Sequence, residues 1–254
     1  MNVFITGASS GIGAALARHY AAAGANLGLY ARRQVALDQL VATLPADGRV
    51  IACAGDVRDA KALSEAASAF ITRFGAPDIV IANAGISQGT LTEHVDDAAA
   101  FRSIFDTNVL GIVHTFQPFL AAMRERRRGT LVGIASVAGF RGLPGAGAYS
   151  ASKAAAITYL ESLRVELIDS GLQVVTICPG YVATPMTAKN PYRMPFLVDA
   201  DSGARLTARA IERQRRFYVF PWPMAIVGWA LRALPRPVYD ALFRKAPRKP
   251  RRPA

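Results

Sequence analysis

Residues that cross-link small secreted domains or bind metal ions are scarce in this sequence. Of its 254 residues, two are cysteine and three are histidine. Cys53 and Cys178 both lie in apolar runs, neither belongs to a C-x-x-C pair, and the histidines are scattered. We therefore expect no disulfide framework, no metal site, and reduced cysteines that fill the core of a cytoplasmic protein.

Long apolar runs are missing as well. Residues 1–13 lack the basic start and the sustained apolar run of a signal peptide, so we expect none. Residues 222–234 are apolar but fall far short of the ~20 residues that span a bilayer. Apolar residues nevertheless make up 52% of the chain, which excludes global disorder and allows a substantial core.

Acidic residues are almost absent from the last fifth of the chain. Residues 205–254 contain 13 lysines and arginines and two acidic residues, whereas residues 1–204 contain 17 and 16. The net charge of +12 therefore comes mainly from the C-terminal fifth, and only there does charge argue for a partner.

Short apolar runs alternate with longer helical patterns, among them long ones at 101–127 and 149–170. The apolar runs are rich in Val, Ile and Leu without strict alternation, as in strands covered on both faces. They occupy residues 2–6, 26–30, 49–54, 78–83, 130–136, 172–179 and 217–220. The pattern predicts one α/β domain with a Rossmann-type doubly wound parallel sheet over residues 1–220. An apolar, then basic, helical extension follows over residues 221–254.

A glycine-rich turn joins the first predicted strand to the first helix. Gly7, Gly11 and Gly13 give the spacing G-x-x-x-G-x-G, and the helix begins near Ile12. Glycines let the backbone approach a ligand closely, and unpaired N–H groups at a helix start attract a pyrophosphate. An ordinary βα turn is the alternative, but the position between strand and helix favours dinucleotide binding.

No acidic residue follows the second strand, where many dinucleotide sites use one to hold the adenosine ribose. Arg32 and Arg33 stand there instead. Because a guanidinium can bind a 2′-phosphate with two hydrogen bonds, the sequence favours NADP(H), with NAD(H) as the alternative. Asp56 ends the third strand and could bind the adenine amine, unless it caps the next helix in place of Asp59.

Four polar side chains are expected to meet at the carboxyl edge of the sheet. Tyr149 and Lys153 lie four residues apart on one helix face, and an ammonium beside a phenol lowers the pKa of the phenol. Ser136 ends the preceding strand, and Asn108 lies inside the helix predicted at 101–127. Together they predict acid–base chemistry on a substrate oxygen; a half-buried tyrosine with an extended lysine is the structural alternative.

With these motifs the chain resembles the short-chain dehydrogenase/reductase family. The family patterns are T-G-x-x-x-G-x-G, N-N-A-G, a catalytic asparagine and serine, Y-x-x-x-K, and P-G followed by threonine. The matching residues are 6–13, 82–85, Asn108, Ser136, Tyr149, Lys153, Pro179, Gly180 and Thr184. Ala82 replaces the first asparagine of N-N-A-G, which does not affect the chemistry. The resemblance extends from residue 2 to about residue 220.

This resemblance implies an NADP(H)-dependent oxidoreductase that interconverts a ketone or aldehyde and an alcohol. Tyr149 would be the proton donor and Ser136 would polarise the carbonyl oxygen. Lys153 would bind the nicotinamide ribose, and Asn108 would hold a relay water. The cofactor-binding residues that it implies are Gly7, Ser9, Ser10, Gly11, Ile12, Gly13, Arg32, Arg33, Asp56, Val57, Asn83, Ala84, Gly85, Tyr149, Lys153, Pro179, Gly180, Val182 and Thr184.

Apolar residues in the loops after the strands are candidate walls of the substrate site. They are Phe140, Leu143, Tyr181, Met186, Tyr192, Met194 and Phe196. They favour a small-molecule carbonyl or alcohol substrate with a bulky apolar body, unless they simply pack together. No fixed cation is evident for an acidic substrate, although Arg141 and Arg193 could serve.

The C-terminal extension allows three interpretations. Two helices packed over the cleft or a dimer partner, with a solvated basic tail, rank first. Peripheral membrane contact through residues 217–245 ranks second, because apolar and aromatic residues there are flanked by arginines. Nucleic-acid binding fits the charge of the tail but has no motif, and it ranks last. The family resemblance implies a homodimer, or a homotetramer, formed through the helices predicted at 101–127 and 149–170.

Two alternatives to an enzyme remain at this point. One is a non-catalytic dinucleotide-binding sensor, or a membrane-surface scaffold, that acts through the C-terminal segment. The other is an RNA-binding protein with a vestigial cofactor site. The four candidate catalytic residues argue against the sensor, because a sensor needs no proton donor.

Overall fold

Seven parallel strands form one sheet, in the order β3-β2-β1-β4-β5-β6-β7. The structure is a computed structural model that describes residues 1–45 and 49–251. The strands are β1 (Asn2–Thr6), β2 (Asn26–Ala31), β3 (Val50–Ala54), β4 (Ile79–Ala82), β5 (Gly129–Ile134), β6 (Leu172–Pro179) and β7 (Phe217–Phe220). The strand order reverses between β1 and β4, as in a doubly wound sheet. The predicted Rossmann-type fold and single domain are confirmed.

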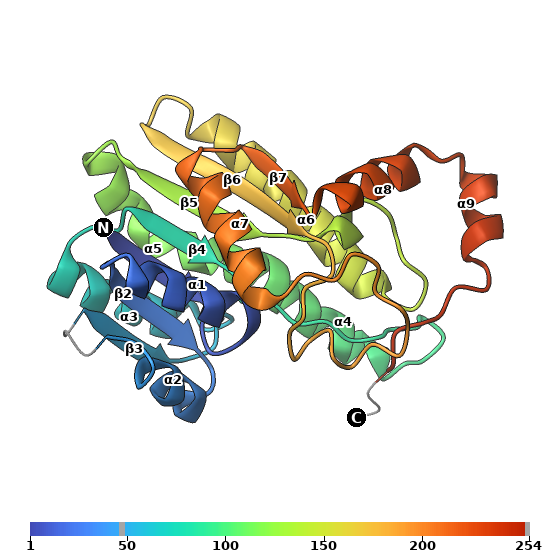
Figure 1. Cartoon of the computed structure of the whole chain (residues 1–254), viewed down its shortest axis with the longest axis horizontal. Coiled ribbons are helices and arrows are strands. Elements are labelled where there is room, and N and C mark those ends of the chain that lie inside the picture. Colours follow the sequence, from blue (N-terminus) through green and yellow to red (C-terminus); the bar gives the residue numbers. More distant parts are fainter. Residues whose placement is uncertain (46–48, 252–254) are drawn as a thin grey trace.

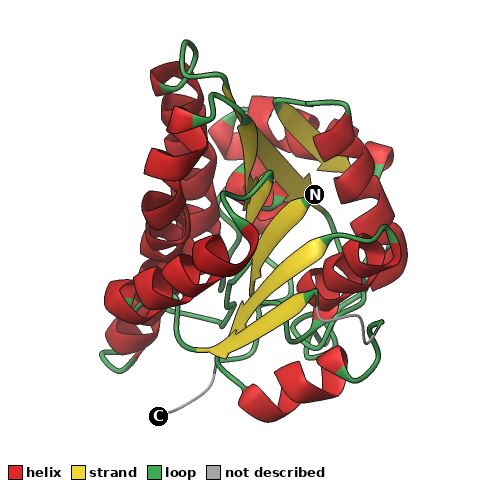
Figure 2. Ribbon diagram, turned by 90° about the vertical axis from the view of Figure 1, so that its left-hand side faces the viewer, coloured by secondary structure: helices red, strands yellow, loops and turns green. Residues whose placement is uncertain are grey.

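Helices cover both faces of the twisted sheet (Figures 1 and 2). One face carries α1 (Gly11–Ala22), α2 (Gln34–Val41) and α7 (Ala200–Glu212), and the other carries α3 (Ala60–Phe74), α5 (Gly111–Glu125) and α6 (Gly147–Glu166). Neighbouring strand residues such as Leu131 and Val132 belong to opposite apolar clusters. Burial on both faces explains why the strand sequences lack polar alternation.

The helix predicted at 101–127 is interrupted. Its two parts, α4 (Asp97–Phe105) and α5, are joined by a π-helical turn, η1 (Asp106–Leu110), that contains Asn108. The Asn108 side chain bonds to both backbone groups of Ile86, in the loop after β4. The local period therefore changes because of a contact 22 residues away, which no helical pattern could indicate.

The pair of helices expected in the C-terminal extension is confirmed. The chain passes a cis Phe220–Pro221 peptide into α8 (Trp222–Ala233) and then α9 (Arg236–Phe243). The prediction of a solvated tail is wrong as far as Arg251, because the chain returns from α9 towards α4 and bonds to it (Figure 1). Residues 252–254, which end the predicted tail, lie outside the described residues.

Both cysteines are free thiols. Cys178 is buried among apolar side chains, as expected, and Cys53 is partly buried. In the part of the chain that the structure describes, no helix is both long and apolar enough to cross a bilayer.

Candidate active site

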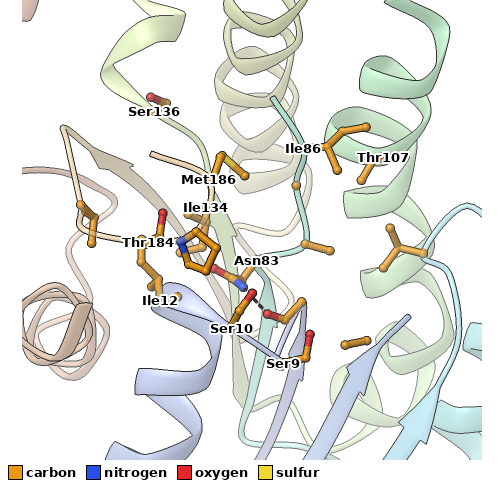
Figure 3. A pocket seen from close by; sticks show the side chains of 18 of the residues that line it. Ser9, Ser10, Ile12, Asn83, Ile86, Thr107, Ile134, Ser136, Thr184 and Met186 are labelled. Carbon is orange, nitrogen blue, oxygen red and sulfur yellow. Dashed lines mark hydrogen bonds between the residues drawn. The ribbon is translucent and has the colours of Figure 1, made fainter. Parts of the chain in front are cut away.

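An elongated cleft follows the carboxyl ends of the strands, where the strand order reverses. Its empty volume is about 1210 Å³, the space at its open mouth included. The cleft runs from the glycine turn after β1 to Ser136 and Tyr149, which suits an extended ligand. In Figure 3, Ser9 and Ser10 lie at one end of the cleft and Ser136 at the other, with Asn83 and Thr184 between them.

All the predicted cofactor-binding residues except Gly13 line this cleft. Sequence reasoning did not single out several other lining residues, which are Ala31, Gly55, Ile86, Thr107, Ile134, Ala135 and Thr187. Most of them are chain neighbours of predicted residues. Their position at strand ends is the signal that could have identified them.

The glycine turn forms a narrow cradle at the start of α1. Gly7 and Gly11 have φ values of +66° and +55°, which side-chain-bearing residues rarely adopt. A Cβ on Gly13 would collide with the Gly7 carbonyl oxygen. Gly13 therefore does not line the cleft, but its lack of a side chain lets the glycine turn pack closely on α1. The Ser10 side chain makes no capping bond to α1. Free N–H groups and a close-fitting backbone are what a pyrophosphate requires, so these residues fit a dinucleotide.

Asn83 braces this cradle from β4. Its Nδ2 donates to the carbonyl oxygens of Thr6 and Gly7 at 3.0 and 3.2 Å, and its backbone N–H donates to Thr6 Oγ1 at 3.2 Å. Asn83 thereby fixes the glycine turn while lining the cleft.

The two arginines after β2 line the cleft near the glycine turn. Arg33 Nη2 lies 3.4 Å from Ser9 Oγ, and both arginines are exposed. Arg32 is near Asp56 and helps to lower the pKa of that carboxyl, but the hydrogen-bonded partner of Asp56 is Arg58. The cleft therefore presents two guanidinium groups where an adenosine ribose would be bound.

Asp56 lines the cleft but already has a partner. Its Oδ1 accepts from the Arg58 N–H at 3.0 Å, and its Oδ2 accepts from the guanidinium of the same residue at 3.0 and 2.7 Å. Burial alone would raise the pKa of Asp56, but the bonds to Arg58 lower it below its usual value. Asp59 caps α3 by accepting from Ala62 N–H at 3.0 Å, so Asp56 is not the cap.

Lys153 is almost completely buried, with 4% of its surface exposed. Its Nζ donates to the Ile134 carbonyl oxygen at 2.7 Å and lies 5.9 Å from the centre of the Tyr149 ring. Burial lowers the pKa of Lys153 to about 8. The ammonium therefore has one neutral partner and remains available to a ligand in the cleft.

Burial raises the pKa of the Tyr149 phenol, and the neighbouring Ser136 hydroxyl opposes that rise. The lowering expected from Lys153 is wrong for this structure, because that ammonium is directed at the Ile134 carbonyl. Ser136 Oγ accepts from Ala138 N–H at 3.1 Å and lies 3.4 Å from the Pro179 carbonyl oxygen. A protonated phenol and a hydroxyl thus share the inner end of the cleft.

Asn108 lies behind the cleft and is fully buried. Its Oδ1 accepts from Ile86 N–H at 2.8 Å, and its Nδ2 donates to the Ile86 carbonyl and Ser152 Oγ, both at 3.0 Å. A Cβ on Gly85 would lie 3.3 Å from Asn108 Oδ1 and 3.6 Å from Lys153 Nζ, so the three residues meet. The relay water predicted for Asn108 stays a prediction.

Of the predicted substrate walls, Met186 lines the cleft. Tyr192 lies 6.5 Å from Tyr181, ring to ring, and burial with the nearby phenols of Tyr181 and Tyr149 raises the pKa of Tyr192 to about 12. Tyr192 therefore lies near Tyr149. The other six predicted walls do not line this cleft; they are Phe140, Leu143, Tyr181, Tyr192, Met194 and Phe196.

Phe140 and Arg141 contact the C-terminal helices α8 and α9. The Phe140 ring lies 5.2 Å from that of Trp229 on α8. Arg141 Nη1 donates to the carbonyl oxygens of Arg232 and Leu234, both at 3.2 Å, and its guanidinium lies 4.4 Å from the Tyr239 ring centre. Arg141 is thus not the free cation that the sequence offered for an acidic substrate.

Within residues 1–45 and 49–251, no three His, Cys, Asp or Glu side chains lie close enough to hold a metal ion.

The family model of short chain dehydrogenases matches residues 1–194. The chain belongs to the short-chain dehydrogenase/reductase family. An uncharacterized oxidoreductase of Myxococcus xanthus (strain DK1622) is 40% identical over 242 residues, which cover 95% of each chain. This short-chain dehydrogenase/reductase is therefore an enzyme that acts on CH–OH or carbonyl groups with a nicotinamide dinucleotide.

Solved structures of the family agree with this assignment. A short-chain dehydrogenase/reductase from Burkholderia phymatum, in complex with NAD, has a TM-score of 0.82 and 26% identity, covering 100% of this chain and 97% of that one. An alcohol dehydrogenase from Thermococcus sibiricus, complexed with 5-hydroxy-NADP, has a TM-score of 0.76 and 26% identity, covering 86% and 95%. Two relatives that are equally identical in sequence to this chain are thus complexed, one with NAD and the other with a form of NADP.

Proposed function

We propose that this enzyme is NADP(H)-dependent and interconverts a ketone or aldehyde and an alcohol with a bulky apolar body. The observation that carries the proposal is the arrangement of one cleft. Tyr149, Ser136 and Lys153 lie at its inner end, and Arg32 and Arg33 lie beside the glycine turn. A proton donor and three cationic side chains are therefore available to one extended ligand.

The residues present fit the cofactor along the whole cleft. The glycine turn and the start of α1 would hold its pyrophosphate, Arg32 and Arg33 its 2′-phosphate, and Lys153 its nicotinamide ribose. The Pro179–Gly180 turn, with Val182 and Thr184, would hold the nicotinamide. The bound cofactor supplies or accepts the hydride.

The proton chemistry belongs to Tyr149. Its hydroxyl gives a proton to the carbonyl oxygen in reduction and takes one from the alcohol in the reverse reaction. Burial raises its pKa, which keeps the phenol protonated at neutral pH, as a donor requires. Ser136 Oγ orients and polarises the same oxygen, and Asn108 supports the loop that carries Gly85 beside Lys153.

A panel of apolar ketones and aldehydes tests this function directly. NADPH oxidation, read by the loss of its absorbance, should occur with at least one apolar ketone and more slowly with NADH. Tight binding of NADPH without turnover of any carbonyl or alcohol in the panel would favour a non-catalytic sensor instead.

A homodimer is part of the proposal. Large apolar side chains are exposed on α4, on η1 and at the end of α6, namely Phe101, Leu110, Val165 and Ile168. Because α4 and α6 are in contact, we expect these side chains to belong to one interface. Burying them against a second copy would remove them from water. A tetramer would need a further interface, which the exposed faces of α8 and α9 do not define.

A second proposal concerns α8, which exposes Trp222 and Ile226, four residues apart, with Trp222 73% exposed. Basic residues follow this apolar stripe in the chain, namely Arg232 on α8, Arg236 on α9, and Arg244 and Lys245 after α9. Exposed tryptophan on a cationic helix suits the interface of an anionic membrane. We therefore propose peripheral contact with anionic lipid through α8 and α9.

A further inference from the structure

Residues 247–251, here called the C-terminal strap, lie across loops next to the cleft. The Pro250 carbonyl oxygen accepts from Gly89 N–H at 3.1 Å. The Arg251 guanidinium binds both carboxylate oxygens of Asp97, at 2.8 and 3.1 Å, and Asp97 is only 5% exposed. The strap is thus fixed to the loop after β4 and to the start of α4, where Figure 1 shows the chain returning from α9.

Two glycines allow the strap to lie close to these loops. A Cβ on Gly89 would collide with the Lys249 carbonyl oxygen, and one on Gly145 would lie 2.7 Å from Cβ of Arg248. The two loops also join each other, because Thr90 N–H donates to the Gly145 carbonyl at 3.1 Å. The strap therefore packs on the point where the loop after β4 meets the segment that leads into α6.

The side chain of Lys249 extends from the strap towards Tyr149, the proposed proton donor. Its Nζ donates to Ser87 Oγ at 2.7 Å and lies 5.6 Å from the centre of the Tyr149 ring. Lys153 Nζ lies at a similar distance, 5.9 Å, from the same ring. Lys153 has an expected role towards the cofactor, whereas nothing in the function proposed so far uses Lys249.

Lys249 has no anionic partner in the part of the chain that the structure describes. Among the ion pairs of the described residues, Arg251 binds Asp97, but none includes Lys249. Ser87 is a neutral acceptor, and burial lowers the pKa of Lys249. Arg251 and the Pro250 backbone already attach the strap, so attachment does not require a partly buried ammonium, which is costly without an anion.

We propose that Lys249 is a substrate-recognition residue, which binds a carboxylate or phosphate on the substrate whose carbonyl oxygen receives the Tyr149 proton. The inference rests on the proposed function and narrows its substrate class. The substrate is a ketone or secondary alcohol with an apolar body and an anionic group a few bonds from the reacting carbon. The strap would then complete the substrate site, and the ammonium would select for the anion.

Pairs of ketones that differ only in the anion test this inference. Benzoylformate is compared with its methyl ester, and hydroxyacetone phosphate with hydroxyacetone, by NADPH oxidation; the two pairs distinguish a carboxylate from a phosphate. Wild-type kcat/KM should be about tenfold to a hundredfold higher for the anionic member of at least one pair. The free energy of a hydrogen bond to a charged group corresponds to a change in affinity of this size. Equal rates for both members of both pairs would overturn the inference.

Variants show whether Lys249 causes the preference. Lys249→Met should lose about tenfold to a hundredfold in kcat/KM for the anion and less than about threefold for the neutral partner, and Lys249→Arg should restore part of the loss. Lys245→Met, an exposed lysine of the same segment, is the matched control and should behave as wild type. Equal losses on anion and neutral partner contradict the inference, and so do gains on both in Lys249→Met, which would mean that the strap blocks the site.

Anion binding separates this inference from the reaction itself. Benzoate and inorganic phosphate are titrated by calorimetry into the NADP⁺-saturated enzyme. Wild type and Lys245→Met should bind at least one of them about tenfold more tightly than Lys249→Met. That result in an enzyme that reduces no ketone would contradict the proposed function and support Lys249 as an anion site. Identical binding by all three proteins would refute the role of Lys249.

Discussion

At the residue scale, the buried ammonium of Lys153 is the group of the site that we expect to lower the free energy of unfolding most. Its ammonium is buried with the Ile134 carbonyl as the only hydrogen-bond partner among the described residues. A buried cation lowers stability, and a cofactor hydroxyl or phosphate recovers part of that cost on binding. The cofactor-free enzyme should therefore be less stable than a variant without this charge.

The pH dependence of stability tests the buried charge. In the unfolded chain Lys153 has a pKa of about 10.4, and in the folded chain about 8, so the unfolded state binds more protons between these values. The contribution of Lys153 to the stability of the cofactor-free enzyme, read as the difference between wild type and Lys153→Met, should thus rise with pH from about 8 to about 10, by on the order of 3 kcal/mol. Lys153→Met should be more stable at neutral pH and lack this rise, measured by urea denaturation.

The control for this measurement is Lys61→Met, an exposed lysine on α3. The free energy of unfolding of this variant should rise with pH as that of wild type does. If Lys153→Met rises with pH in the same way as wild type, the ammonium is not the group that is responsible.

The proposed preference for NADP(H) rests on the two arginines after β2, Arg32 and Arg33. Arg33→Ala and Arg32→Ala should each weaken NADPH binding about tenfold to a hundredfold and leave NADH binding nearly unchanged, because only NADPH carries the 2′-phosphate. Dissociation constants from the quenching of protein fluorescence give both numbers. Arg213→Ala, an exposed arginine after α7, is the control. Equal weakening of both nucleotides would remove the arginines from 2′-phosphate recognition.

At the element scale, α8 combines an inner and an outer role. Trp229 packs against Phe140 and the edge strand β7, whereas Trp222 and Ile226 remain exposed. Trp229 and the buried Met224 and Gly228 therefore hold the helix on the body, while Trp222 and Ile226 are free to contact another surface.

Vesicle binding measures the outer role of α8. Wild type should co-sediment with vesicles that contain phosphatidylglycerol, less at high salt, and little with phosphatidylcholine alone. The double variant Trp222→Ser/Ile226→Ser should bind roughly tenfold less, because two apolar side chains no longer enter the interface. Unaltered binding by this variant, or equal binding to both lipids, would rule out α8 as the lipid contact.

The sequence indicated the elements of the cleft because each depends on a short local pattern. The glycine turn, the strand-end Ser136 and the Tyr149–Lys153 helix pair are all of this kind. The bonds that organise η1 and the strap join residues far apart in the chain, such as Arg251 and Asp97. A Lys/Arg/Pro-rich segment has no apolar period, so its docking, and with it Lys249, could not be predicted from the sequence.

At the scale of the whole molecule, we expect the exposed apolar residues on α4, η1 and α6 to be buried against a second copy of the chain. Wild type should be a dimer by light scattering, and Val165→Asp should shift it towards a monomer, since a carboxylate would be buried without a cation. Val165 is 57% exposed. Val35→Asp on α2, where the valine is 70% exposed, is the matched control and should stay dimeric. A monomeric wild type would contradict the proposed interface.

The function proposed for the whole molecule depends on the phenol of Tyr149, which lines the cleft. Tyr149→Phe removes the hydroxyl and keeps the ring between the cofactor site and the strap. The measurement is the single-turnover rate of ketone reduction by this variant, together with its affinity for NADPH. We predict a rate reduced at least about a thousandfold with NADPH affinity within about threefold of wild type, because the general acid is lost and the binding groups remain. A variant that turns over near the wild-type rate would show that Tyr149 does not donate the proton.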